Sequence, residues 1–234
     1  MFTQDIISIL IPTYNEADNM KDTLERIIGT FDNINTNYEI LVIDDASEDD
    51  TVKIAGGLLA QKKGSVISRL CIRSLSLSVL DGIKQSKGNI IIVMDADGSH
   101  PPELIPLFIK DIQEGYDLVI ASRYIEGGGS EGLPLLRKIM SRFACLLGRA
   151  VTKVKDNTSG FFCVRKSALE GISLTPSGFK IGLEIFVKAN INSFKEIPYT
   201  FTNRKRGESK LRIKACMQYL YQIFSLLAYK ITKI

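Results

Sequence analysis

Short apolar runs alternate along the first half of the chain with segments whose apolar residues recur every three or four positions. The short runs, rich in isoleucine and valine, predict strands at residues 6–11, 38–43, 66–72, 90–94 and 118–121. The longer periodicity predicts helices at residues 19–30, 49–60, 77–85 and 102–114. This alternation is typical of a Rossmann-like α/β fold, a mostly parallel sheet flanked by helices.

The second half of the chain is less regular. It predicts a helix at residues 135–151 and strands at residues 161–164 and 195–201. An uncharged stretch, residues 215–229, then predicts a C-terminal amphipathic helix. One face would carry Lys214, Gln218, Gln222, Ser225 and Tyr229, and the other Leu220, Ile223, Phe224, Leu227 and Ile231. A helix of this length is too short to span a bilayer, so we expect it to lie at a membrane surface or to pack on protein.

Ligands of open α/β sheets bind beyond the carboxyl ends of the strands. Polar or acidic groups follow four of the predicted strands, in the segments Pro12-Thr13-Tyr14-Asn15-Glu16, Asp44-Asp45, Asp95-Ala96-Asp97 and Ser122-Arg123. The sequence therefore predicts a polar site at one edge of the sheet.

The carboxylates of this edge have two interpretations. Asp95 and Asp97 leave a buried strand together, and hard oxygen ligands of this kind suit Mg²⁺ or Mn²⁺ when a diphosphate completes the shell. Alternatively, they belong to an acidic loop that caps the following helix. Asp45 or its neighbour could bind a base or ribose, or the pair could simply precede a helix capped by Ser47.

Composition limits the class of protein. Hydrophobic residues make up 45% and charged residues 24% of the 234 residues, which is ordinary for one folded α/β domain. The four cysteines are far apart, so we expect neither a zinc site nor a disulfide framework. The N-terminal residues lack the pattern of an export signal, so we expect a cytoplasmic protein.

The net charge of +4 is unevenly distributed. Residues 203–234 contain eight Lys or Arg and one Glu, a charge of +7, which leaves −3 for residues 1–202. A basic tail on a weakly acidic body predicts an anionic partner, such as lipid headgroups or phosphates. A solvated basic terminus is the simpler alternative.

In order and spacing the strand-end motifs resemble the family 2 glycosyltransferases of GT-A fold. The resemblance extends through Asp95-Ala96-Asp97-Gly98-Ser99-His100-Pro101-Pro102-Glu103. Two further motifs resemble those of the polyprenyl (dolichyl) phosphate mannose synthases: Ser122-Arg123-Tyr124-x-x-Gly127-Gly128 and Arg204-x-x-Gly207-Glu208-Ser209-Lys210-Leu211. The resemblance covers residues 6–211.

The resemblance implies a role for each matching residue. The nucleotide-sugar donor would be bound by Pro12, Tyr14, Glu16, Ile43, Asp45, Asp95, Ala96, Asp97, Lys180, Arg204 and Lys210. The metal would be held by Asp95, Asp97 and Ser99, although the family usually has Gln in place of Ser99. A second departure is that the usual glycine-rich stretch reads Ser74-Leu75-Ser76-Leu77-Ser78.

The same resemblance implies that Arg123, Arg137 and Ser141 bind the acceptor phosphate and act with Asp97 in catalysis. Arg137 and Ser141 are four residues apart on a predicted helix, hence on one face. A surface salt bridge is the simpler interpretation of Arg137. A phosphate monoester is mostly dianionic at neutral pH, so it can attack without a general base, and the chain has only one histidine.

The resemblance implies an inverting transferase that moves mannose from GDP-mannose to a polyprenyl phosphate, and the D-x-D carboxylates favour Mg²⁺ or Mn²⁺ as its metal. We expect residues 1–210 to form the catalytic domain and residues 211–234 a membrane- or partner-binding helix. The enzyme would lie on the cytoplasmic face of a membrane, with no nucleic-acid partner. Transfer of glucose or another sugar from a UDP-sugar to a polyprenyl phosphate or glycan is one alternative, and a non-catalytic nucleotide-sugar binding module is another.

Overall fold

The computed structural model describes residues 5–32, 34, 36–60, 62–70, 72–175, 180–202 and 213–232. A seven-stranded sheet has the order β3-β2-β1-β4-β7-β5-β8, and β6 pairs with β9 in a separate two-stranded sheet. The strands are β1 (Ile6–Thr13), β2 (Asn37–Asp44), β3 (Gly64–Ser68), β4 (Ile90–Val93), β5 (Leu118–Ser122), β6 (Gly129–Glu131), β7 (Phe162–Arg165), β8 (Phe194–Pro198) and β9 (Thr200–Thr202).

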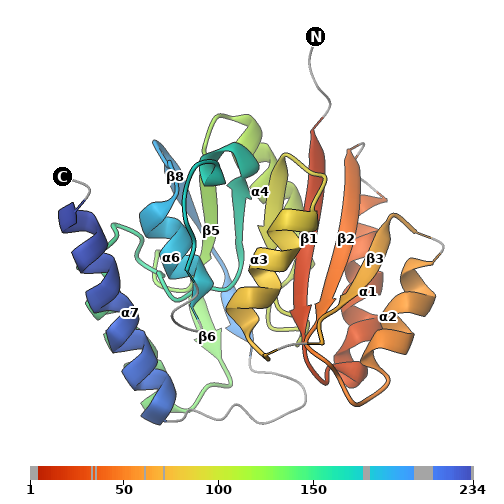
Figure 1. The fold of residues 1–234 in the computed structure, drawn as a ribbon, viewed down its shortest axis with the longest axis horizontal. Helices are drawn as coiled ribbons and strands as arrows, with labels where there is room; N and C mark the ends of the chain where they lie inside the picture. The colour runs from red at the N-terminus through yellow and green to blue at the C-terminus, as the bar shows by residue number, and fades with distance from the viewer. Residues whose placement is uncertain are drawn as a thin grey trace.

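Helices cover both faces of the large sheet (Figure 1). They are α1 (Ala17–Phe31), α2 (Thr51–Leu59), α3 (Leu75–Gln85), α4 (Ile105–Gln113), α5 (Leu135–Gly148), α6 (Ile181–Lys188) and α7 (Ile213–Thr232), with 3₁₀ turns η1 (Pro102–Leu104) and η2 (Lys166–Leu169). Only β7 runs antiparallel to its neighbours in the large sheet. The predicted mixed, mostly parallel α/β fold is confirmed.

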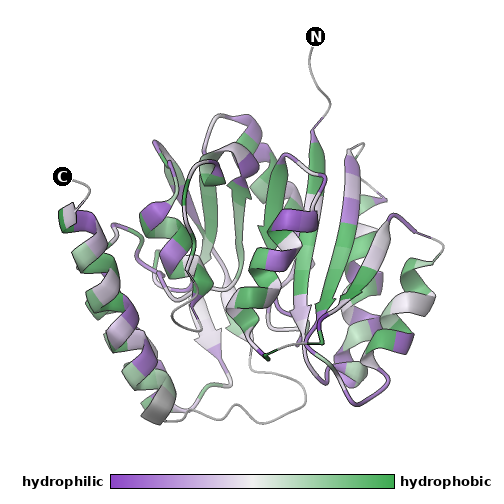
Figure 2. Cartoon of the chain, viewed as in Figure 1, coloured by the Kyte–Doolittle hydropathy of each residue, from purple (hydrophilic) through white to green (hydrophobic). Residues whose placement is uncertain are grey.

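The core lies in two layers, one on each side of the sheet. On β1, Ile9 and Ile11 join the layer under α1, α2 and α4, whereas Leu10 joins the layer under α3 and α6 because successive side chains of a strand point to opposite faces. The central strands β1 and β4 are therefore apolar on both faces, as the hydropathy colouring shows (Figure 2). This arrangement holds the carboxyl ends of β1, β2 and β4 side by side.

Two parts of the second half were wrongly predicted or missed. The strand expected at residues 195–201 is divided between β8 and β9, which belong to different sheets. Helix α6 was missed because it is buried on nearly every side, so its sequence lacks the periodicity of a half-exposed helix.

In the first half, the predicted helix cap is wrong. Ser47 does not cap α2, which begins four residues later at Thr51.

The C-terminal amphipathic helix exists as α7, and its predicted apolar face is correct for Ile223 and Leu227, which pack on the domain, but wrong for other residues. The buried face contains Tyr219, Gln222, Ile223 and Leu226, and the predicted apolar residue Phe224 is 68% exposed. The tertiary contact with Val151 and Leu183 selects the face that includes the polar Gln222. Within the described residues, no helix is both long enough and apolar enough to cross a membrane.

Candidate active site

A cavity of about 280 Å³ lies at the carboxyl ends of β1, β2 and β4. It is lined by most of the residues predicted to bind the donor and by several that were missed: Pro12, Thr13, Tyr14, Glu16, Asp45, Arg73, Leu75, Ser78, Asp95, Ala96 and Asp97. Parallel strands deliver these side chains to one edge because their carboxyl ends point the same way. The predicted polar site at this edge is therefore present.

The loops that follow β1 and β2 are bonded to each other. The backbone N–H of Asn15 donates to Ser47 Oγ at 2.9 Å, and the N–H of Glu16 donates to Thr51 Oγ1 at 2.9 Å. The Asn15 side chain accepts from the N–H of Glu48 at 2.9 Å. Asn15 has φ 53°, a left-handed conformation that asparagine tolerates better than most residues. These bonds fix the loops that carry Tyr14, Glu16 and Asp45.

The adjacent carboxylates Asp44 and Asp45 have different environments. Asp44 accepts the N–H of Ser47 at 3.0 Å and the hydroxyl of the same serine, so it shapes the turn after β2. Asp45 lines the cavity. Its Oδ2 accepts the N–H of Ser74 at 2.8 Å, and its Oδ1 pairs with the guanidinium of Arg69. The pair predicted after β2 thus divides into a turn residue and a cavity residue.

Two arginines of this region were missed. Arg69 is 5% exposed and also bonds Asp81 at 2.8 Å, so two carboxylates compensate its buried charge. Arg73 lies over the ring of Tyr14, 3.3 Å from the ring centroid. Arg69 directly follows β3, which ends at Ser68 rather than at the predicted residue 72, whereas Arg73 lies five residues beyond the strand. The same rule that singled out the other strand ends would have found Arg69 with the correct end of β3.

The two carboxylates of the D-x-D motif fit a divalent metal bound together with a diphosphate. Both line the cavity, and the side chain of Asp95 is 34% exposed there. Asp97 Oδ1 accepts from the N–H of Ser99 at 3.0 Å and from its hydroxyl at 2.5 Å, which orients the buried carboxylate. The described residues contain no cluster of three or more His, Cys, Asp or Glu suited to a metal. Donor phosphates would therefore be needed to complete the shell, as is usual for Mg²⁺.

His100 is a structural residue of this loop. Its ring is 3% exposed, stacks on Phe161 with centroids 5.0 Å apart, and accepts the N–H of Asp95 through Nδ1 at 2.9 Å. Burial lowers its pKa below the ordinary value, although the nearby Asp95 and Asp97 oppose this shift. The neutral ring therefore positions Asp95.

Arg123, which follows β5, is held by a buried carboxylate. Its Nε and Nη2 donate to the two oxygens of Asp156, each at 2.7 Å, and Nη2 also donates to Thr158 Oγ1 at 2.9 Å. Asp156 is fully buried. Burial disfavours both charges, but their hydrogen bonds outweigh it, raising the pKa of Arg123 and lowering the pKa of Asp156. The guanidinium is therefore charged and fixed. Asp156 was missed because it lies in a polar loop that the sequence leaves unassigned.

Helix α5 carries the other predicted acceptor residues. The hydroxyl of Tyr124 donates to Ser141 Oγ at 2.7 Å. Because Tyr124 is the chain neighbour of Arg123, this bond links the predicted acceptor residues Arg123 and Ser141. Arg137 is partly buried one turn earlier on α5, on the same face as Ser141. The residues predicted to bind the acceptor, which we call the acceptor group, thus come from the end of β5 and one side of α5.

Two of the remaining predicted donor residues, Ile43 and Lys180, do not belong to the lining of the cavity. Ile43 is fully buried and packs in the core beside Leu10 and Val79. Lys180 donates through Nζ to the carbonyl of Thr158 at 3.0 Å and lies between the donor and acceptor groups. Its pKa is lowered mainly by burial and secondly by the positive charge of Arg123. Arg204 and Lys210 lie outside the described residues.

Comparison with known proteins identifies the family. The model of the family described as glycosyl transferase family 2 matches residues 8–173. The chain belongs to glycosyl transferase family 2. It is 42% identical over 228 residues to a dolichol-phosphate mannosyltransferase of Pyrococcus furiosus, covering 96% of this chain and 64% of that protein. It is 33% identical over 234 residues to the dolichol-phosphate mannosyltransferase of Saccharomyces cerevisiae, covering 95% and 87% of the two chains.

Solved structures agree on the fold of this family 2 glycosyltransferase. Mannosyl-3-phosphoglycerate synthase from Rubrobacter xylanophilus superposes with a TM-score of 0.71 at 17% identity, covering 99% of this chain and 76% of that chain. Glucosyl-3-phosphoglycerate synthase from Mycobacterium tuberculosis, in complex with Mn²⁺, UDP-glucose and glycerol 3-phosphate, gives a TM-score of 0.68 at 18% identity. It covers 95% of this chain and 79% of that chain. The predicted GT-A fold is confirmed.

Proposed function

We propose that the protein transfers mannose from GDP-mannose to a polyprenyl phosphate of the dolichyl type, with inversion at the anomeric carbon. The observation that carries the proposal is the shared cavity of Tyr14, Glu16, Asp45, Asp95 and Asp97, beside the fixed cation Arg123. Relatives bearing the name dolichol-phosphate mannosyltransferase match over 95% or more of this chain, which supports the same donor and acceptor.

In this proposal Tyr14, Glu16 and Asp45 hold the nucleoside of the donor. Asp45 has oxygens in contact with Arg69 and Ser74, so its orientation is set before the donor arrives. Asp95 and Asp97 hold Mg²⁺ or Mn²⁺, and the bound metal neutralises charge on the departing diphosphate. The Mn²⁺ complex of the mycobacterial synthase supports a divalent ion in this fold.

The acceptor phosphate is bound by Arg123, Arg137 and Ser141. A phosphate dianion attacks without first losing a proton, so the neutral His100 is no obstacle to the reaction. The chain's task is to hold two anions near each other, and Arg123 is suited to it because Asp156 keeps the guanidinium charged and immobile. Lys180, between the two groups, adds a second cation.

A donor panel tests this assignment. Purified full-length chain is incubated with labelled GDP-mannose, GDP-glucose or UDP-glucose, and with polyprenyl phosphate in the presence of Mg²⁺, Mn²⁺ or excess chelator. We expect a mannosyl lipid from GDP-mannose only, and none with chelator. Preferred turnover of UDP-glucose would replace the proposed donor, and full turnover in chelator would remove the metal.

We also propose that the protein acts at the cytoplasmic face of a membrane as a peripheral protein. Large apolar side chains are exposed on α5 and α7, and we call them the apolar helix surface: Leu135, Leu136, Ile139, Phe143, Leu146, Met217, Leu220, Tyr221, Phe224 and Ile231. Exposed apolar residues on two helices with basic neighbours are typical of helices that lie in the membrane interface.

Substitutions confined to exposed positions test the membrane contact. Truncation of α7 would uncover the buried Tyr219 and Ile223, so the double variant Phe143→Gln, Phe224→Gln is the cleaner choice. Each ring buried in lipid contributes about 1.5–3 kcal/mol. We therefore expect the variant to lose vesicle flotation and to retain GDP binding. Unchanged flotation would assign the apolar helix surface to a protein partner.

A further inference from the structure

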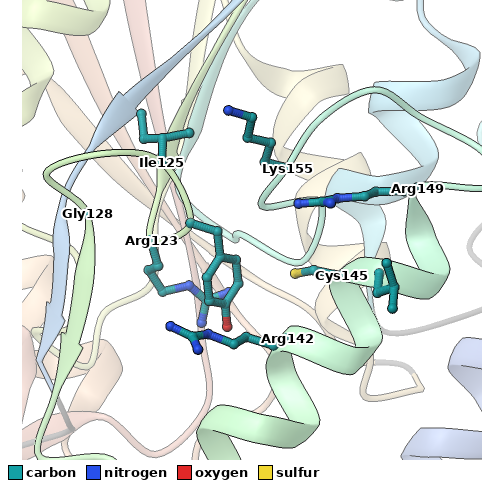
Figure 3. Close-up of a pocket in the computed structure, with 9 residues that line it drawn as sticks. Arg123, Ile125, Gly128, Arg142, Cys145, Arg149 and Lys155 are labelled. Carbon is teal, nitrogen blue, oxygen red and sulfur yellow. The ribbon is translucent and has the colours of Figure 1, made fainter.

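A second cavity, of about 470 Å³, lies between α5 and the loop that follows β5. Its wall is formed by Arg123, Tyr124, Ile125, Gly128, Arg142, Cys145, Leu146, Arg149 and Lys155, as Figure 3 shows. No acidic side chain belongs to this wall within the part of the chain that the structure describes. A concave surface with several cations and no carboxylate favours an anionic ligand.

The charges of the cavity are only partly compensated. Asp156 neutralises Arg123, whereas Arg142, Arg149 and Lys155 are exposed and form no ion pair with a described residue. Beside this wall, the carboxylate of Glu196 accepts the backbone N–H groups of Lys155 and Asp156 at 2.9 and 3.0 Å. The cavity therefore carries an excess of about two positive charges even when Glu196 is counted against the three cations.

The cationic side of the cavity adjoins the apolar helix surface. Arg142, Leu146 and Arg149 recur at intervals of four and three residues, so they share one side of α5. Leu146 is 58% exposed and belongs to both surfaces. The guanidinium groups of Arg142 and Arg149 both extend from α5 toward the loop that carries Arg123 (Figure 3). An amphiphile with a phosphate head and apolar chains fits this arrangement, with the head in the cavity.

We propose that this cavity binds the phosphate of an anionic membrane phospholipid, with Arg142 and Arg149 as its direct ligands and Lys155 as a supporting charge. The planar guanidinium forks of two arginines suit bidentate bonds to a phosphodiester. Of the three residues proposed to bind the acceptor phosphate, Arg123 lines this cavity, whereas Arg137 and Ser141 do not. The proposal rests on the proposed membrane location, and it explains how α5 is held at headgroup level while the acceptor phosphate reaches Arg123.

Vesicle binding by the full chain tests the site. The probes are phosphatidylcholine vesicles with and without phosphatidylglycerol, and the main variant is Arg142→Gln, Arg149→Gln. We expect binding to the anionic vesicles to fall roughly 30-fold, since each basic group near such a surface contributes about a factor of five. Binding to pure phosphatidylcholine should not change. The matched control is Lys53→Gln, Lys62→Gln, with Lys53 on α2 and Lys62 in the turn that follows it, and it should bind as the wild type does. Helix α2 lies on the opposite side of the molecule from α7 (Figure 1).

A charge-preserving variant separates a phosphate site from diffuse attraction. Arg142→Lys, Arg149→Lys keeps the charge but loses the guanidinium forks, so we expect weakened binding to anionic vesicles. If this variant bound as tightly as the wild type, the proposed phosphate site would be wrong, and general electrostatic attraction would explain the binding. Equal binding of the wild type to both vesicle types would overturn it as well.

A soluble acceptor separates the two sources of phosphate. We expect the Gln variant to keep wild-type kcat and KM on a short, water-soluble prenyl phosphate. A raised KM for this acceptor would overturn the proposal by assigning the cavity to the acceptor itself. Absence of turnover in the wild type would instead count against the proposed function, and the vesicle measurements would still decide the phospholipid site.

Discussion

The D-x-D carboxylates of the donor cavity and the acceptor group differ in how far apart in the sequence their supporting residues lie. Asp97 is oriented by Ser99, two residues away, and Asp95 donates its N–H to His100, five residues away. Arg123, in contrast, depends on Asp156, 33 residues away, and Lys180 depends on the carbonyl of Thr158. Binding groups can thus be preorganised by short loops on one side of a sheet and by a buried long-range network on the other.

The two sides also differ in how their charge is balanced. The donor cavity gathers Glu16, Asp45, Asp95 and Asp97, so the proposed binding of an anionic diphosphate there would require a metal. The acceptor side gathers cations, and only Asp156 is placed to compensate Arg123. Substitutions should therefore affect metal-dependent turnover on one side, and stability or acceptor affinity on the other.

The largest effect is expected from Asp156→Asn, which leaves the buried Arg123 without its charge partner. Loss of one member of a buried ion pair costs about 3–5 kcal/mol, so we expect the free energy of unfolding in urea to fall by about this amount. The double variant Asp156→Asn, Arg123→Gln should recover part of the loss. If the single variant were as stable as the wild type, the network would not support the acceptor side.

The same pair predicts a pH dependence. The folded-state pKa of Asp156 lies below its ordinary value of 3.8, because the hydrogen bonds from Arg123 outweigh burial. Its contribution to stability is therefore complete above the unfolded-state pKa and is lost as the pH falls through the folded-state pKa. The difference in unfolding free energy between wild type and Asp156→Asn should be constant near neutral pH and shrink below about pH 4. A constant difference in acid would contradict the assignment.

On the donor side, Asp97→Ala should reduce kcat by about 100- to 1,000-fold, as expected when a group that stabilises developing charge is removed. Stability should change less than in Asp156→Asn, because the removed group is held by local bonds from Ser99. Steady-state kinetics across a Mn²⁺ titration, with calorimetric GDP binding in the absence of metal, would measure both effects. Loss of metal-free GDP binding would mean that Asp97 holds the nucleotide directly.

Arg137→Ala should raise the KM for the lipid phosphate about 10- to 100-fold and leave the KM for the donor nearly unchanged. Hydrogen bonds to charged groups contribute about 1.5–3 kcal/mol, which sets this range. Arg137→Lys is the conservative control and should recover part of the affinity. Equal increases in both KM values would show that Arg137 does not distinguish the two sides.

The smallest effect is expected from Tyr219→Phe on α7. The Tyr219 hydroxyl donates to the carbonyl of Ala144 at 2.9 Å, and it lies 3.2 Å from Asn157 Oδ1, so it ties α7 to α5 and to the loop of Asp156. Loss of this hydroxyl should cost about 1 kcal/mol in the free energy of unfolding. The exposed Tyr221→Phe is the matched control and should be neutral. A larger loss would indicate that α7 also supports the acceptor network.

The sequence by itself determined the alternating strands, the edge of the sheet at which the cavity lies, and most of the residues that line this cavity. It could do so because buried parallel strands are continuously apolar, and because the residues that follow them share one edge of the sheet. The motifs after β1, β2 and β4 needed no knowledge of distant contacts. The end of β3 was misplaced by four residues, and this concealed Arg69.

Only the tertiary structure decided how the acceptor side is built and which face of α7 is buried. Asp156 and Lys180 acquire their partners through contacts between segments that no local periodicity links. Gln222 is buried on α7 because its amide donates to the carbonyl of Lys180 at 2.9 Å, whereas Phe224 is left exposed. A polar side chain can be buried where a hydrogen bond compensates its lost contact with water, and only the folded chain sets the position of the bonding partner.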